Sequence, residues 1–222
     1  MRVQYAIDTL SEDAALRSAE LATNAGLRCL EAGHVLVKAV GVDIVRTLRI
    51  RYPDTEIVAD MKTMDMGRDE VAVAGDAGAD LVIVCAAASD GVLLAAQQEA
   101  RSRGLGLLVS LMGVRDRVGR ARKLLDLGLT RVIAHRGIDD NFHWNDPGPR
   151  ERLAELASLP GIELALAGGI NARTLRDFRE VPLERVIVGR GISEATDPDY
   201  EIRALIEAAA VHLTPATAGV NE

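Results

Sequence analysis

Three charged residues follow a single apolar run near residue 60. The stretch IVADMKTMDMG (57–67) places Asp60, Lys62 and Asp65 within six positions, directly after what we predict to be a buried strand. A strand that ends at the surface accounts for one charge, but an acid, a base and a second acid this close together indicate a site. The ammonium group could neutralise negative charge that develops on a substrate oxygen. Because neighbouring carboxylates favour the charged ammonium form, they argue against Lys62 as a Schiff-base nucleophile.

The rest of the chain supplies the elements that would hold these residues. Short apolar runs recur along the 222 residues, and segments with helical periodicity separate them. The runs are continuous rather than alternating, which is typical of parallel strands covered on both faces. We expect strands at 3–7, 27–32, 56–60, 80–86, 105–111, 131–135, 162–167 and 185–189. This order predicts an α/β fold, a single (β/α)8 TIM barrel over residues 1–212, followed by a flexible tail at 213–222.

A doubly wound open sheet is the alternative arrangement of the same elements. Its dinucleotide-binding form carries G-x-G-x-x-G after the first strand, and no such segment follows residues 3–7. Turn signals agree with the barrel. Thr9 or Ser11 can cap the first helix, and Gly78 and Gly128 each come between a predicted helix and the next strand.

Composition argues against several classes of protein. The formal net charge of −7 predicts no attraction to nucleic acid or anionic membranes, and an aromatic share of 3% argues against base-stacking platforms. No apolar run approaches the roughly 20 residues that span a bilayer. The opening segment MRVQYAIDTLSEDAA lacks the apolar core of a signal peptide, so we expect a cytoplasmic protein. Cys29 and Cys85 form no metal motif and are predicted to be small core residues.

Acidic residues fall at the ends of the first three predicted strands. They are Asp8, Glu31 and Asp60, with Lys62 two positions on, and His135 ends the sixth strand. In a barrel of parallel strands these ends share one rim, where the chemistry takes place. Glu31 and Asp60 offer hard oxygen ligands, which suit Mg²⁺ with water and substrate oxygens completing its shell. A helix cap explains any one acid, but their convergence on one rim predicts a site.

Two glycine-containing segments follow the last two predicted strands. AGGIN carries Gly168 and Gly169, and VGRGIS carries Gly189, Arg190 and Gly191; each opens a predicted helix. Glycines let backbone N–H groups approach an anion, and the helix N-terminus adds positive potential. The loops after strands 7 and 8 are the usual phosphate site of such barrels. We therefore predict that they bind a substrate phosphate, with Arg190 adding a charge-assisted contact; tight turns alone are the alternative.

These segments resemble the orotidine monophosphate decarboxylase superfamily. The specific feature is the D-x-K-x-x-D of Asp60, Lys62 and Asp65 after a third strand. The segments LEAGHVLVK, VADMKTMDMG, AHRG, AGGIN and VGRGISEATDP narrow the resemblance to one branch. That branch contains 3-hexulose-6-phosphate synthase and 3-keto-L-gulonate-6-phosphate decarboxylase. The resemblance runs from Gln4 to about residue 208.

The resemblance implies a role for each charged residue of the rim. Glu31 and Asp60 would bind Mg²⁺, Lys62 would stabilise an enediolate, and Asp8 would contact substrate hydroxyls. His135 would move protons. The substrate implied is a phosphorylated ketose.

The resemblance also implies a phosphate site and a dimer. The loops at 168–169 and 189–191 would hold the phosphate, and we include Arg136, directly after the histidine of the sixth strand, among the substrate-binding residues. In this family the barrel is a homodimer, and Asp65 would reach into the partner's site. A purely local helix cap is the alternative for Asp65.

Some positions depart from the pattern of this branch. Ser110 stands where both enzymes have an acid on the fifth strand, and His34 stands where both usually have Thr. Ile138 and Ala167 replace an Arg and a Thr of the decarboxylase, and KTMD also favours the synthase. The segments EAG, HRG and VGR favour the decarboxylase.

We therefore predict an Mg²⁺-dependent phosphosugar lyase that works through a 1,2-enediolate. The favoured activity is that of a 3-hexulose-6-phosphate synthase, joining ribulose 5-phosphate to formaldehyde. The first alternative is a 3-keto-L-gulonate-6-phosphate decarboxylase. A remote alternative is a non-catalytic barrel that binds a phosphorylated metabolite, and only the loss of the strand-5 acid favours it.

Overall fold

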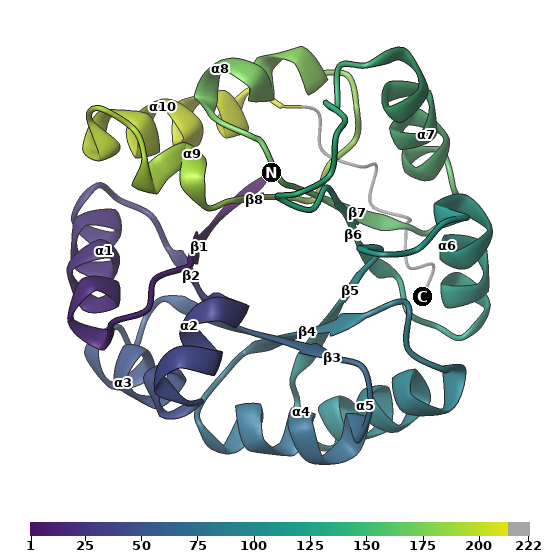
Figure 1. Ribbon diagram of the computed structural model, residues 1–222, viewed down its shortest axis with the longest axis horizontal. Coiled ribbons are helices and arrows are strands. Elements are labelled where there is room, and N and C mark those ends of the chain that lie inside the picture. The colour runs from purple at the N-terminus through teal and green to yellow at the C-terminus, as the bar shows by residue number, and fades with distance from the viewer. Residues whose placement is uncertain (213–222) are drawn as a thin grey trace, which may run out of the picture.

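Eight parallel strands close into a barrel, as Figure 1 shows for the computed structural model, which describes residues 1–212. The strands pair in chain order, and β8 closes on β1. Their bounds are β1 (Arg2–Ile7), β2 (Cys29–Ala32), β3 (Glu56–Thr63), β4 (Leu81–Cys85), β5 (Gly106–Ser110), β6 (Arg131–His135), β7 (Glu163–Ala167) and β8 (Arg185–Val188). The predicted TIM barrel is confirmed, and each expected strand is present. The expected tail at 213–222 lies outside the described residues.

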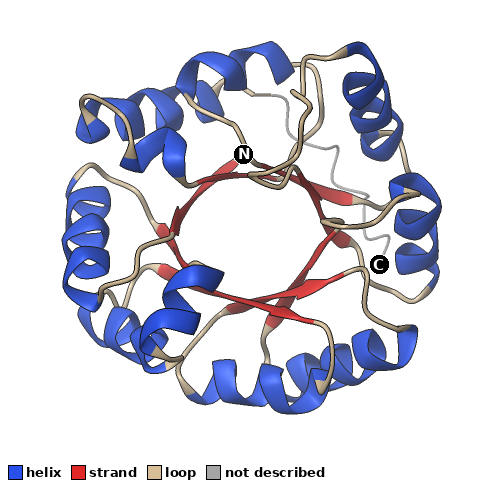
Figure 2. Ribbon diagram, viewed as in Figure 1, coloured by secondary structure: helices blue, strands red, loops and turns tan. Residues whose placement is uncertain are grey.

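Helices form the outer layer and surround the ring of strands (Figure 2). Their bounds are α1 (Glu12–Asn24), α2 (His34–Val40), α3 (Asp43–Arg51), α4 (Gly67–Asp76), α5 (Asp90–Arg103), α6 (Arg117–Asp126), α7 (Pro147–Ala157), α8 (Ala172–Leu175), the 3₁₀ helix η1 (Arg176–Phe178), α9 (Arg190–Ser193) and α10 (Pro198–Ala210). Within residues 1–212, no helix has the length and apolar character needed to cross a membrane.

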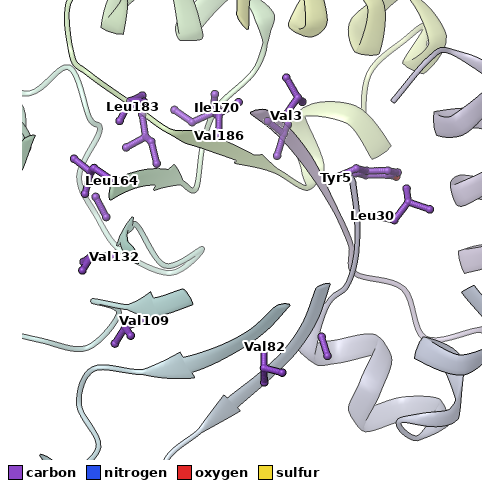
Figure 3. Packing of buried hydrophobic residues seen from close by; sticks show 14 of the residues in the cluster. Val3, Tyr5, Leu30, Val82, Val109, Val132, Leu164, Ile170, Leu183 and Val186 are labelled. Carbon is purple, nitrogen blue, oxygen red and sulfur yellow. The ribbon is translucent and has the colours of Figure 1, made fainter. Parts of the chain in front are cut away.

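Two apolar cores follow from the alternation of side chains along each strand. One core lies between the strands and the helices. Figure 3 shows part of it, with Tyr5, Val109 and Val186 among its labelled residues. The other core fills the barrel and contains Ala6, Cys29, Val58, Leu81, Ile83, Leu108, Ile133, Ala165, Ala167 and Ile187. Because the period is two, the inward positions continue to the rim at Asp8, Glu31, Asp60, Cys85, Ser110, His135 and Gly189.

The local signals in the sequence explain several element boundaries. Ser11 caps α1, because its side chain accepts a hydrogen bond from the Ala14 N–H at 3.4 Å. Gly78 and Gly128 have φ values of +95° and +75° between a helix and the following strand, a conformation that glycine adopts without steric cost. Each supports the division into strand–helix units read from the sequence.

Strand β3 extends further than the sequence predicts. The expected end was Asp60, but the strand continues to Thr63, with a shift of register between these two residues. Lys62 lies inside the shift with a φ of 46°, which is uncommon for a residue other than glycine. The irregularity lets Thr63 pair with Val84. The apolar pattern does not predict this extension, because Asp60, Lys62 and Thr63 interrupt the continuous apolar run.

Candidate active site

Asp60 and Lys62 form a buried ion pair at the end of β3. The Lys62 Nζ donates to Asp60 Oδ2 at 2.6 Å, and their side chains are 14% and 5% exposed. Burial would lower the pKa of Lys62, but the attraction of the Asp60 carboxylate outweighs it and raises the pKa. Lys62 is therefore a positive charge held at the rim. The other carboxylate oxygen, Asp60 Oδ1, is buried without a hydrogen-bond partner.

Glu31 is the second buried acid of the rim. Burial, followed by repulsion from Asp60, raises the pKa of Glu31 to about 8. Burial also raises the pKa of Asp60, against the opposing effect of Lys62. One oxygen of Glu31, Oε2, accepts a hydrogen bond from the side-chain amide of Gln4. Two buried carboxylates that are both ionised cost folding free energy unless a cation lies between them.

The donor set at this rim fits a hard divalent cation. Asp60 Oδ1 is an anionic oxygen without a partner, and Glu31 lies close enough for the Asp60 carboxylate to disfavour its charge and raise its pKa. In residues 1–212, no group of three or more His, Cys, Asp and Glu side chains could hold a metal ion. The residues therefore fit a cation that takes two protein carboxylates and completes its shell with water and substrate oxygens, as Mg²⁺ does.

His135 faces this charged pair from β6. Its Nδ1 lies 3.1 Å from the hydroxyl of Ser110, and that hydroxyl also accepts from the Met112 N–H at 3.3 Å. Burial, with the positive charges of Lys62 and Arg117, lowers the pKa of His135 to about 3. The ring is therefore neutral near pH 7. Because Ser110 engages Nδ1, Nε2 is the nitrogen left for proton exchange with a ligand.

His34, a departure from the family pattern, also lies at the rim. Its Nδ1 is 3.8 Å from Asp8 Oδ1 and 3.8 Å from Asp60 Oδ2. It is the first residue of α2 and follows Gly33, where a Cβ would collide with the Asp8 carboxylate. The structure therefore brings Asp8, predicted to contact substrate, to the edge of the Asp60–Lys62 pair.

The two glycine loops lie against each other. A Cβ at Gly191 would collide with the carbonyl of Ile170, and one at Gly168 would collide with the carbonyl of Arg136. Gly168 has a φ of +91°, which also favours glycine. These glycines therefore have a packing role whether or not the loops bind phosphate.

Arg136 lies beside the first of these loops. A Cβ at Gly169 would collide with its guanidinium, and its Nε is buried without a hydrogen-bond partner. Its Nη2 donates to the Asp140 carbonyl at 3.3 Å. Arg190, exposed, begins α9, a helix of only four residues that follows Gly189. The structure thus gathers the predicted phosphate-binding residues at one part of the rim.

Asp65 stands apart from this cluster. Helix α4 begins at Gly67, and its N-cap residue, Met66, has no side-chain capping bond. Asp65 Oδ1 accepts only from the adjacent Met66 N–H, at 2.8 Å, among the hydrogen bonds of the described residues. The interpretation of Asp65 as a helix cap is therefore wrong. Asp65 is exposed, between Met64 and Met66, which are 51% and 61% exposed.

Sequence reasoning did not select Gln4, Arg117 and Cys85, which lie at or near the site. Gln4 is fully buried, and a polar residue inside an apolar strand run was the available signal. The Arg117 guanidinium lies 5.4 Å from the Phe142 ring centre and 5.9 Å from that of Trp144. No local pattern predicts that contact, because it joins the start of α6 to the loop after β6. Cys85 is buried as predicted, at the end of β4.

Comparisons with known proteins agree with this geometry. The family described as Orotidine 5'-phosphate decarboxylase / HUMPS matches residues 1–205. The 3-hexulose-6-phosphate synthase of Mycobacterium gastri is 34% identical over 212 residues, which cover 93% of this chain and 100% of that protein.

Two solved structures show the same similarity in three dimensions. The 3-hexulose-6-phosphate synthase from Salmonella typhimurium has a TM-score of 0.89 at 28% identity, covering 96% of this chain and 100% of its own. The 3-keto-L-gulonate-6-phosphate decarboxylase from Vibrio cholerae has a TM-score of 0.83 at 28% identity, covering 94% of this chain and 97% of its own. Structural similarity therefore does not separate the two activities.

Proposed function

Because the chain belongs to the orotidine 5'-phosphate decarboxylase / HUMPS family, we propose that it is an Mg²⁺-dependent lyase that converts a phosphorylated ketose through a 1,2-enediolate. The protein is a lyase of the orotidine monophosphate decarboxylase superfamily. The observation that carries the proposal is the buried Asp60–Lys62 pair, whose second carboxylate oxygen has no partner, beside the buried acid Glu31.

The favoured activity is that of a 3-hexulose-6-phosphate synthase. A base removes the C1 proton of ribulose 5-phosphate, and the resulting enediolate forms a C–C bond with formaldehyde, whose oxygen then takes up a proton. His135 is the group proposed to move these protons, because it is neutral and one ring nitrogen is engaged by Ser110. When bound by Glu31 and Asp60, Mg²⁺ supplies a positive charge to the substrate oxygens. The Lys62 ammonium stabilises the negative charge of the enediolate.

Ligand binding follows from the remaining rim residues. Asp8 accepts hydrogen bonds from substrate hydroxyls, and its place beside His34 and Asp60 supports this role. The phosphate lies at the loops 168–169 and 189–191, close to Arg136. The unpartnered Nε of Arg136 supports an anion there.

Two observations favour the synthase over the decarboxylase. The curated relative at 34% identity is a synthase, and Ile138 and Ala167 replace residues typical of the decarboxylase. The decarboxylase remains the second candidate, because a solved decarboxylase is as similar in sequence as a solved synthase. A non-catalytic barrel is disfavoured, because Ser110 still contacts His135 where the strand-5 acid is missing.

We further propose a homodimer with shared active sites. Asp65 is exposed, and within residues 1–212 its side chain accepts a hydrogen bond only from the neighbouring Met66 N–H. The methionines on either side of it are also exposed. Exposed apolar side chains around a charge are consistent with an interface. A cytoplasmic location stays a prediction from the sequence.

One experiment tests the proposed activity directly. The purified protein is incubated with a panel of pentulose and hexulose phosphates, with and without formaldehyde, in Mg²⁺ or in EDTA, and products are followed by NMR. The synthase proposal predicts a hexulose phosphate only when ribulose 5-phosphate, formaldehyde and Mg²⁺ are all present. Loss of CO₂ from 3-keto-L-gulonate 6-phosphate would indicate the decarboxylase activity instead. Full activity in EDTA would contradict a metal-dependent mechanism.

A further inference from the structure

A chain of buried polar side chains crosses the interior of the barrel beneath the rim. It begins at Arg185, the first residue of β8, and ends at Glu31 near the end of β2. The Arg185 Nη1 donates to Gln4 Oε1 at 2.9 Å, and the Gln4 Nε2 donates to Glu31 Oε2. Arg185, Gln4 and Glu31 are 2%, 0% and 3% exposed. Such a network is unexpected in a barrel filled otherwise by apolar residues, because each buried polar group must be satisfied.

The order of donors and acceptors in this chain is determined by its two ends. A guanidinium has only donors, so the side chain of Gln4 must present its oxygen to Arg185. The amide nitrogen then faces Glu31, where a carboxylate oxygen accepts. If the amide were rotated by half a turn, its nitrogen would face the Arg185 donor and its oxygen would face the Glu31 carboxylate, and neither hydrogen bond could form. Arg185 therefore determines the direction of the Gln4 amide, and Gln4 occupies one oxygen of Glu31.

Arg185 is itself held in place from below. Its Nη1 donates to Glu56 Oε2 at 2.7 Å, and Glu56 also pairs with Arg2. The Cys29 Sγ lies 3.0 Å from Glu56 Oε2 and 3.2 Å from the Arg185 Nη1. The Arg185 side chain is only 3% exposed, so its guanidinium has few alternative positions.

We propose that Gln4 and Arg185 are positioning residues for the metal ligand Glu31. Arg185 orients the amide of Gln4, and the amide holds the Glu31 carboxylate so that its other oxygen faces the rim. The inference rests on the proposed metal site at Glu31 and Asp60. Groups that bond to a ligand from behind commonly change metal affinity by about 10–100-fold when removed.

The first test measures metal affinity without substrate. Mn²⁺ replaces Mg²⁺, and free Mn²⁺ is quantified by electron paramagnetic resonance. Gln4→Met keeps the length of the side chain but removes both polar atoms, and we expect Mn²⁺ affinity to fall by about 10–100-fold. Arg185→Met should also weaken binding, while Glu56 keeps its pair with Arg2.

The double variant distinguishes a relay from two separate effects. If Arg185 acts through Gln4, then Gln4→Met/Arg185→Met binds Mn²⁺ no more weakly than Gln4→Met alone. If the double variant instead lost Mn²⁺ affinity by the product of the two single-variant factors, the relay would be contradicted. Arg131→Met is the matched control, because Arg131 pairs with Glu163 at the same end of the barrel and, within residues 1–212, makes no hydrogen bond to Gln4 or Glu31. Its affinity for Mn²⁺ should equal that of the wild type.

A second measurement uses the unmutated protein and so does not depend on how the variants fold. The chain has three glutamines, Gln4, Gln97 and Gln98. In ¹⁵N-glutamine-labelled protein, the side-chain amide signal of Gln4 should shift during a Mg²⁺ titration and saturate with the metal. The Gln97 amide, which donates to the Gly128 carbonyl at 2.8 Å outside the barrel, should not shift. A stationary Gln4 signal at saturating Mg²⁺ would overturn the inference.

The outcomes separate this inference from the proposed function. If Mn²⁺ fails to bind, or binds equally well to Glu31→Gln, the metal site is wrong and the inference fails with it. If Glu31→Gln loses Mn²⁺ but Gln4→Met binds as the wild type does, only the inference is wrong.

Discussion

The Lys62 ammonium lies 2.6 Å from one oxygen of Asp60, while the other oxygen of the same carboxylate is buried without a hydrogen-bond partner. The carboxylate thus neutralises the lysine with Oδ2 and keeps Oδ1 available for a second cation. With the proposed cation at Oδ1, the Asp60 carboxylate would have a positive charge beside each of its oxygens. This arrangement is suited to a substrate that gains negative charge during the reaction.

Lys62→Ala should lower kcat by about two to three powers of ten, the scale expected for the loss of one preorganised electrostatic group. The measurement is the rate of the aldol reaction at saturating substrate and Mg²⁺. Lys123→Ala is the control, because Lys123 of α6 pairs with Asp90 of α5 and its side chain is 58% exposed. A Lys62→Ala rate close to that of the wild type would remove Lys62 from the mechanism.

His135→Asn should slow the exchange of the substrate C1 proton with solvent, since general acid–base groups contribute ~10²–10⁴-fold. Exchange is followed by NMR in D₂O, without formaldehyde, so that only proton removal is measured. Ser110→Ala should slow exchange less, because it removes only the hydrogen bond to Nδ1. Unchanged exchange in His135→Asn would point to His34 or Arg136 as the proton carrier.

Glu31→Gln should change how the stability of the metal-free protein depends on pH. The pKa of Glu31 is raised in the folded state to about 8, so the protonated form favours folding. This contribution is fully present below the unfolded pKa of about 4.3 and is lost as pH rises through about 8. Gln does not titrate, so Glu31→Gln should match the wild type near pH 4 and exceed its unfolding free energy at pH 8.5 by up to roughly 5 kcal/mol.

Urea unfolding in EDTA at the two pH values measures this difference. Saturating Mg²⁺ should reduce or reverse the advantage of Glu31→Gln at pH 8.5, because the cation stabilises only the wild-type carboxylate pair. Parallel pH profiles for the two proteins would show that Glu31 is not a buried acid with a raised pKa.

Asp65→Ala and Lys62→Ala should each be nearly inactive as pure homodimers if Asp65 completes the partner's site. After subunit exchange, a heterodimer has one site with both lesions and one with neither, so its activity should approach half that of the wild type. Asp65→Ala should unfold at nearly the same urea concentration as the wild type, because Asp65 does not cap α4. An active Asp65→Ala homodimer, or no recovery despite proven exchange, would contradict a shared site.

The sequence by itself determined the architecture and the location of the charged rim. Continuous apolar runs depend on burial on both faces of a strand, so they marked each of the barrel strands. Asp8, Glu31, Asp60 and His135 could be assigned to one rim because parallel strands end on the same side. Turn positions such as Ser11 and Gly78 were also readable, since caps and left-handed turns depend on nearby residues alone.

Only the tertiary structure decided how these side chains meet. The register shift after Asp60 turns Lys62 onto the Asp60 carboxylate, and no periodicity predicts an irregular strand end. Gln4 contacts Arg185 across 181 positions because β8 closes on β1, a contact that depends on ring closure rather than on local propensity. The alternative of a helix cap at Asp65 is excluded only by the start of α4 at Gly67, with Met66 as its N-cap. Contacts of this kind arise from packing between distant segments, which a single sequence does not encode in any local pattern.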